Sequence, residues 1–177
     1  LLGCELDAGD EDLAHITDAA WKTVVAANDP PRYFRYGERP ARIDQDKDGA
    51  PFVSALDRSR MRHVMARVAW WFVWKKAPDG NGFVQVDALP PLAVVEDALA
   101  TAPPPLPALD GIVESPVFAR DGTLHATPGY QPASRLLYAP PEGFESPEVP
   151  EKPDEADLSE ARTLILEELL GDFPFKS

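Results

Sequence analysis

The sequence predicts an α+β fold, in which short helices alternate with antiparallel hairpins. Two segments, 13–28 and 57–76, carry apolar residues at the spacing of an amphipathic helix. Between and after them, turn residues such as Asp121-Gly122 separate short runs of β-forming residues. The composition is that of a globular protein, with 44% hydrophobic and 27% charged residues in 177. The order of the segments is compatible with a winged-helix-like first half followed by a small β segment.

The first predicted helix covers 13–28, after an acidic and weakly patterned start. One apolar stripe runs along it, formed by Leu13, Ile16, Ala20, Val24 and Ala27. Thr17 and Asp18 are capping residue types, so a shorter helix that starts there is the alternative. Pro30 and Pro31 end the helix, because proline cannot continue its hydrogen-bond ladder. Short strands at 33–36, 41–43 and 51–56 are predicted next, with turns at Gly37 and 46–49.

The second predicted helix, 57–76, has the strongest helical pattern in the chain. Asp57 or Ser59 can cap its start, and the turn residues at 79–82 follow its end. Its core stripe consists of Met61, Val64, Met65, Val68 and Phe72. Its opposite side carries cations and aromatics, namely Arg60, His63, Arg67, Trp70 and Trp74, flanked by Arg58 and Arg62.

This opposite side is the candidate site. Basic side chains bind phosphates and aromatic rings stack on unpaired bases, so a helix face of this kind is typical of nucleic-acid binding. The candidate nucleic-acid-binding residues are Arg58, Arg60, Arg62, Arg67, Trp70, Trp74, Lys75 and Lys76. In the alternative interpretation, this side packs under the neighbouring hairpin and the arginines pair with local acids.

The remaining segments are a strand at 82–87, a helix at 92–101 opened by Pro90-Pro91, and a Pro-rich connector at 102–107. A short strand pair joined at Asp121-Gly122 is then predicted, followed by a turn at Pro128-Gly129 and a third strand that ends at Tyr138. A last helix is predicted at 163–170, with Gly171 as its C-terminal cap.

Four parts follow from this organisation. They are a helix and hairpin domain at 1–101, the β segment at 102–138, an acidic Pro-rich linker at 139–158, and a C-terminal helix with a docking tail at 159–177. The tail carries Phe173 and Phe175, large apolar side chains that we expect to dock onto another domain or chain. In the alternative, they fold back onto this domain.

Charge is distributed unevenly along the chain. The net charge is −13, yet residues 21–76 carry twelve Lys and Arg against six acids, a net of +6. Residues 1–20 carry six acids and no Lys or Arg, and residues 77–177 have a net charge of −13. The total argues against a nonspecific nucleic-acid coat protein, and the distribution divides the chain into an acidic start, a basic third and an acidic remainder.

The sequence predicts no catalytic residues, no metal site and no cofactor. It contains neither the Gly-x-x-x-x-Gly-Lys-Ser/Thr phosphate loop nor the Gly-x-Ser-x-Gly nucleophile elbow. Cys4 is its one cysteine, so no disulfide forms within these residues. Asp44, Asp46 and Asp48 are interpreted as a hairpin turn, with a two-metal site as the minor alternative. No apolar run is long enough to span a bilayer, which predicts a cytoplasmic protein without membrane partners.

Several segments carry a family resemblance. They are Leu106-Pro107, Gly-Ile-Val-Glu-Ser-Pro-Val at 111–117, Asp121-Gly122, Gly-Tyr-Gln-Pro-Ala-Ser at 129–134, and the stretches 26–34, 89–95 and 168–175. This pattern, spread from about 21 to 175, resembles phage- and plasmid-type primase–helicase proteins. In that family, similar segments precede a nucleotide-hydrolysing helicase domain, whose catalytic signatures are absent here.

The resemblance and the missing motifs favour a non-catalytic accessory domain of a mobile-element DNA replication primase–helicase. Its expected partners are DNA and an adjoining ATPase domain, which it would help to assemble or to engage DNA. A free-standing nucleic-acid-binding module is one alternative, and an acidic protein-interaction or regulatory module is another. Association of copies into a homo-oligomer is left open.

Overall fold

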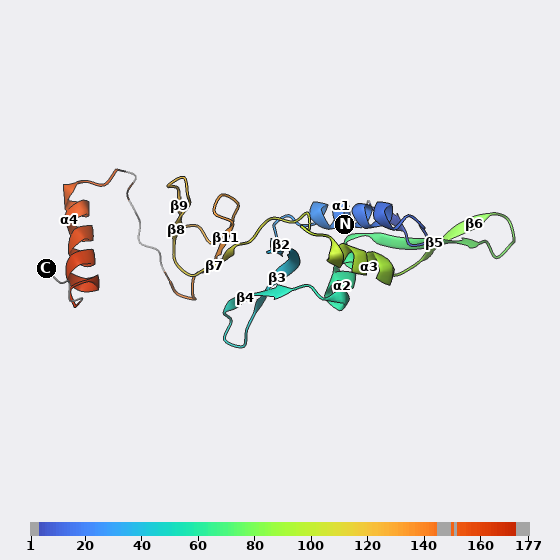
Figure 1. Cartoon of the computed structure of the whole chain (residues 1–177), viewed down its shortest axis with the longest axis horizontal. Helices are drawn as coiled ribbons and strands as arrows, with labels where there is room; N and C mark the ends of the chain where they lie inside the picture. The colour runs from blue at the N-terminus through green and yellow to red at the C-terminus, as the bar shows by residue number, and fades with distance from the viewer. Residues whose placement is uncertain (1–3, 145–149, 151, 173–177) are drawn as a thin grey trace. The chain divides into compact units, whose positions relative to one another are not determined.

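The structure is a computed structural model that describes residues 4–144, 150 and 152–172. It falls into two compact units, Leu1–Phe144 and Glu145–Ser177, and each is described by itself. The predicted α+β class is confirmed, because helices and small, mostly antiparallel sheets are mixed along the chain (Figure 1). The connector predicted at 102–107 and the β segment after it both fall within the first unit.

The elements of the first unit are, in order, β1 (Glu5–Asp7), α1 (Leu13–Ala26), β2 (Tyr33–Tyr36), β3 (Arg39–Gln45), β4 (Pro51–Ala55), α2 (Arg58–Val68), β5 (Trp70–Lys76), β6 (Phe83–Asp87), α3 (Leu92–Ala100), β7 (Gly111–Val113), β8 (Val117–Phe118), β9 (Leu124–His125), β10 (Gly129–Gln131) and β11 (Leu136–Tyr138).

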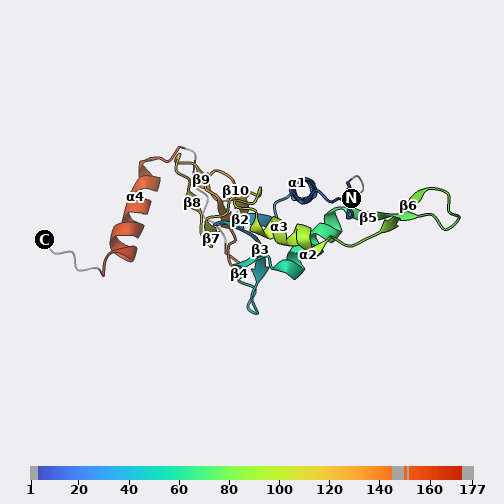
Figure 2. The same ribbon diagram turned by 45° about the vertical axis from the view of Figure 1, so that its right-hand side comes forward.

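The main core is formed by helices α1, α2 and α3 with strands β1 and β5 of the sheet β1-β5-β6. Figure 2 shows the three helices near the start of β5. Strand β5 is the centre of this sheet, with β1 parallel on one side and β6 antiparallel on the other. Leu6 and Trp71 bring the sheet into the core, where they meet Met61 and Val95, both without exposed surface. The basic helix α2 and the strand that follows it are therefore anchored in one core.

Side-chain caps fix where the first two helices begin. The Asp12 carboxylate accepts a hydrogen bond from the His15 backbone N–H at 3.0 Å, and that of Asp57 accepts one from Arg60 at 2.8 Å. Each cap satisfies a donor that has no partner within the helix. The cap predicted at Asp57 is confirmed. The shorter first helix is wrong, because Thr17 is buried inside α1.

The predicted helix 57–76 is wrong in its second half. Helix α2 ends at Val68, Ala69 is extended with φ −141° and ψ 155°, and β5 begins at Trp70. Aromatic and β-branched residues from Trp70 to Trp74 favour a pleated surface. Strand β1 pairs with β5 from Trp70 to Phe72 and β6 pairs with it from Phe72 to Lys76, so each residue of β5 has a partner strand on at least one side. The Trp71 indole donates to the Met65 carbonyl at 3.0 Å, which satisfies an acceptor at the end of α2.

The winged-helix arrangement stays a prediction. Three helices share the core and the hairpin β5–β6 follows α2 directly, while the sheet β2-β3-β4 stands between α1 and α2 in the chain. In Figure 1, the hairpin β5–β6 extends beyond the helices of the first unit, with its turn at the far end.

The rest of the first unit contains smaller sheets. The β2-β3-β4 sheet is antiparallel, close to the strands predicted there. Asp121-Gly122 joins β8 to β9 as predicted, and Gly122 has the positive φ of 86° that such a turn needs. The first strand of this pair is shorter than predicted, because β7 pairs in parallel with β11 instead. Arg35 of β2 bonds through its backbone to Pro107 and Leu109, both at 2.8 Å, which joins this segment to the β2 edge.

The second unit contains α4 (Glu155–Thr163) and a π-helical continuation, η1 (Leu164–Leu169). The helix predicted at 163–170 therefore begins earlier, at a capping box formed by Asp154 and Asp157. The linker predicted at 139–158 is shorter than expected. Its first residues, to Phe144, belong to the first unit, and its last residues, from Glu155, belong to α4. Phe173 and Phe175 lie outside the described residues. Among those that are described, no helix has the length and apolar character to cross a membrane.

Candidate nucleic-acid interface

An aromatic row lies on the face of β5 that points away from the core. Side chains alternate along a strand, so Trp70, Phe72 and Trp74 share one face while Trp71 enters the core. The ring centroids of Trp70 and Phe72 are 5.3 Å apart, and those of Phe72 and Trp74 are 5.7 Å apart. Both separations are those of aromatic contacts. The three rings form one continuous apolar surface.

Strand β6 extends this surface toward the hairpin turn. Phe83 pairs with Lys76 and Gln85 pairs with Trp74, which places their side chains on the face of the aromatic row. The Phe83 side chain is 70% exposed, Trp74 is 54% exposed and Trp70 is 39% exposed. We call Trp70, Phe72, Trp74 and Phe83 the aromatic face. Trp74 and Phe83, the two members nearest the turn, are the most exposed, whereas Phe72 is buried.

Charge changes sign along the aromatic face. Lys76 lies at the turn end, and Lys75 is its neighbour on the opposite face of the strand. At the other end, Glu5 pairs with Trp70, Asp7 pairs with Phe72, and Asp87 pairs with Phe72 from the β6 side, so three carboxylates share this face. The Trp70 indole donates to the Asp87 carboxylate at 2.7 Å. A phosphate is therefore attracted at the turn end and repelled at the other.

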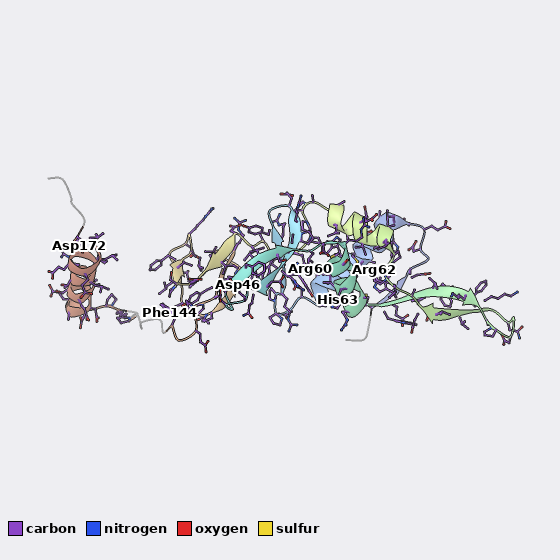
Figure 3. All side chains as sticks on the ribbon, turned by 90° about the horizontal axis from the view of Figure 1, so that it is seen from below. Asp46, Arg60, Arg62, His63, Phe144 and Asp172 are labelled. Carbon is purple, nitrogen blue, oxygen red and sulfur yellow. The ribbon has the colours of Figure 1, made fainter. Side chains whose placement is uncertain are left out.

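Three of the four candidate arginines on α2 bind other parts of the first unit. Arg58 forms an ion pair with Glu96 of α3 at 2.8 Å. Arg60 bonds to the Ser54 hydroxyl and lies 3.6 Å from the Asp44 carboxylate. Arg62 donates from Nε to the Pro90 carbonyl at 2.9 Å. Figure 3 shows Arg60 and Arg62 on α2 among these elements. These arginines hold α2 against its neighbours, as the alternative interpretation expects.

The remaining candidates are exposed. Among the ion pairs and side-chain hydrogen bonds of the described residues, none involves Arg67, Trp74, Lys75 or Lys76. The single basic and aromatic helix face predicted for 57–76 is wrong, because Trp70, Trp74, Lys75 and Lys76 are on β5. The structure keeps Trp74 and the two lysines together and places them on a hairpin.

Phe72 and Phe83 are the members of the aromatic face that sequence reasoning missed. Phe72 fitted the helical core stripe, and it is buried to 7% exposure, but between two tryptophans and not in the helical core. The alternation of Trp70, Phe72 and Trp74 at spacing two was the available signal. Phe83 becomes part of the site only through the register of β5 with β6.

The aspartates of the β3–β4 turn have structural partners. Asp44 forms an ion pair with Arg42 at 2.7 Å. Asp46, labelled in Figure 3, accepts hydrogen bonds from the backbone of Asp48 and Ala50, both at 2.9 Å. These contacts favour the predicted turn over the two-metal alternative. Within 4–144, 150 and 152–172, no group of three or more His, Cys, Asp and Glu residues could hold a metal ion.

A partly buried serine–histidine contact is also accounted for by local structure. His125 Nδ1 lies 3.0 Å from the Ser134 hydroxyl, and the histidine is buried. The same hydroxyl oxygen accepts a hydrogen bond from the Leu136 backbone at 3.3 Å and lies 3.4 Å from the Gln131 carbonyl. The serine is thus held inside the β10–β11 turn, where its hydroxyl organises the backbone.

Comparison of the chain with protein-family models, with curated proteins and with solved structures finds no match.

Proposed function

We propose that this protein is a non-catalytic accessory module that engages nucleic acid through the turn end of the β5–β6 hairpin. The observation that carries the proposal is the exposed aromatic face with Lys75 and Lys76 at its end. Aromatic rings offer stacking surfaces to bases and lysines attract phosphates, a combination found in proteins that bind nucleic acid with little sequence preference.

The surrounding charge limits where a strand of nucleic acid runs. The protein as a whole has a net charge of −13, which opposes binding over most of its surface. The carboxylates of Glu5, Asp7 and Asp87 oppose it at the other end of the aromatic face as well. Binding is therefore confined to the turn end, whereas Arg67, in the last turn of α2, precedes the other end of β5.

The wider role rests on the resemblance of segments such as 129–134 to primase–helicase proteins. On that basis we place the module in mobile-element DNA replication in the cytoplasm, beside an ATPase domain that performs the hydrolysis. The module itself guides or holds DNA for that domain.

Fluorescence anisotropy with labelled DNA across a salt series tests the proposal. The double variant Lys75→Ala/Lys76→Ala should bind more weakly, and its salt slope should fall by about 1.4, roughly 0.7 for each lost contact to single-stranded DNA. The variant Lys22→Ala/Lys47→Ala removes two exposed lysines from α1 and the β3–β4 turn, and is the matched control. The proposal is refuted if no DNA binds at low salt, or if the two double variants lose affinity equally.

Docking onto another protein is the second candidate, favoured by the second unit. Five large apolar side chains of α4 and η1 are about half exposed or more, namely Leu158, Leu164, Ile165, Leu166 and Leu169. Replacing Leu166 and Leu169 by serine should then weaken association with a neighbouring ATPase domain, measured by calorimetry, and leave DNA binding by the first unit unchanged. Equal association of the variant and the wild type would exclude this role for the helix.

A further inference from the structure

We infer that the aromatic face takes unpaired bases, so that the module binds single-stranded nucleic acid in preference to duplex. This inference rests on the proposed function and specifies its ligand. In a duplex, each base presents its faces to its neighbours in the stack, and a flat row of side chains on a sheet cannot reach them. In a single strand the faces are accessible, and each stacks on an aromatic ring.

Trp74 and Phe83 are the stacking residues. They are the most exposed rings of the aromatic face, at 54% and 70%. Trp74 is opposite Gln85, and Phe83 is two residues from Gln85 along β6, so Trp74 and Phe83 are diagonal neighbours across the strand pair. Diagonal neighbours on adjacent strands are about 7–8 Å apart. Two successive bases of an extended strand can therefore each meet one ring.

The other two rings have supporting roles. Phe72 is 7% exposed between Trp70 and Trp74, with its ring plane 86° from that of Trp74, so that it supports Trp74 from the side. Trp70 is held by its hydrogen bond to Asp87 and is surrounded by carboxylates that repel a phosphate. Trp70 is therefore a matched control for Trp74: the same residue type, on the same strand and face, and outside the inferred path of the strand.

Lys76 determines where the phosphate backbone of the bound strand lies. It pairs directly with Phe83 on the same face and lies two residues beyond Trp74. A phosphate bound to Lys76 is thus next to both stacking rings. The ligand is recognised by base faces and phosphates, which RNA and DNA share.

The test uses the full chain and three labelled probes of equal length. They are oligodeoxythymidine of roughly 12 nucleotides, within the usual range of single-strand site sizes, the same backbone without bases, and a duplex of the same length. We expect oligodeoxythymidine to bind most tightly. Trp74→Ala should weaken its binding by roughly 5- to 150-fold, the range for loss of stacking on one base, and should leave the other two probes nearly unchanged.

Two further variants separate stacking from a loss of folded protein. Trp74→Phe keeps an aromatic ring and should recover most of the affinity for oligodeoxythymidine, whereas Trp70→Ala should have little effect. Tryptophan fluorescence gives an independent readout. A base stacked on Trp74 should quench this fluorescence. The quenching should disappear in Trp74→Phe, because Trp21 and Trp71 are buried and Trp70 lies outside the inferred path of the strand.

The outcomes distinguish this inference from the proposed function. If all three probes bind alike and Trp74→Ala changes none of them, the protein binds nucleic acid by charge alone and the stacking inference is overturned. The same conclusion follows if Trp70→Ala and Trp74→Ala weaken oligodeoxythymidine binding equally. If none of the probes binds at low salt, the proposed function fails as well.

Discussion

Asn28 connects α1 to β2, and its replacement by alanine should cost about 3 kcal/mol of stability. The residue is buried, and its side chain makes three hydrogen bonds to the backbone of the following turn. Its amide donates to the Tyr33 carbonyl at 2.8 Å, and its carbonyl oxygen accepts from the Arg32 and Tyr33 N–H groups at 2.8 and 2.9 Å. Each such bond contributes about 0.5–1.5 kcal/mol.

Urea denaturation followed by circular dichroism measures this cost. With an m value of about 2 kcal/mol/M, a loss of about 3 kcal/mol lowers the midpoint by about 1.5 M. Asn28→Asp keeps the acceptor of two bonds and loses the donor of the third, so it should have an intermediate midpoint. Asn81→Ala is the matched control, because Asn81 is exposed in the β5–β6 turn. A midpoint for Asn28→Ala equal to that of Asn81→Ala would refute this account of the turn.

Three further outcomes are expected. Met61→Ala should lower the free energy of unfolding by about 2–5 kcal/mol, because the side chain has no exposed surface; a loss below about 1 kcal/mol in urea would contradict this. Asp12→Ala should cost about 1 kcal/mol through loss of the α1 cap, clearly more than the exposed Asp18→Ala. Burial raises the pKa of Tyr130 above 10.0, and its hydroxyl donates to the Ala108 carbonyl at 2.7 Å. The pKa of Tyr130 is higher in the folded protein than in the unfolded chain. The contribution of its protonated hydroxyl to stability is therefore present below pH about 10 and is lost as pH rises through the folded pKa. Tyr130→Phe should flatten that alkaline decline, and an unchanged decline would assign it to other groups.

The sequence predicts the local elements of the first unit well where a turn residue or a cap marks their ends. Asp57 marks the start of α2, and Gly122 marks the turn between β8 and β9. The end of α2 carries no such mark. Ala69 is compatible with a helix, and Val68 and Phe72 continue the helical spacing of Met61 and Met65, so the sequence pattern predicts a helix where the structure has a strand. Here tertiary pairing decides between two patterns that the local sequence allows.

Pairing between distant segments could not be predicted. Strands β1 and β5 pair although more than sixty residues separate them in the sequence. Strand β7 pairs with β11, although β8, β9 and β10 lie between them in the sequence. Neither pairing follows from the spacing of apolar residues, because the strands are only three residues long where they meet. Of the residues in the proposed site, the sequence points to Trp74, Lys75 and Lys76, while Phe83 and the carboxylates beside Trp70 become neighbours only through these pairings.

Ala69 is the single residue between α2 and β5, and the length of this connection affects which side chains of β5 face the core. Trp70, Trp71, Phe72 and Val73 are all apolar, so either alternation of β5 could fill the core, and polarity does not choose between them. The one-residue connection at Ala69, together with the pairing of β5 with β1 and β6, fixes which side chains face the core. One inserted residue would turn Trp71 to solvent and Trp74 inward, reversing inside and outside along the entire strand. At the connection between α2 and β5, one apolar residue can therefore replace another, but an insertion or deletion would reverse the two faces of β5.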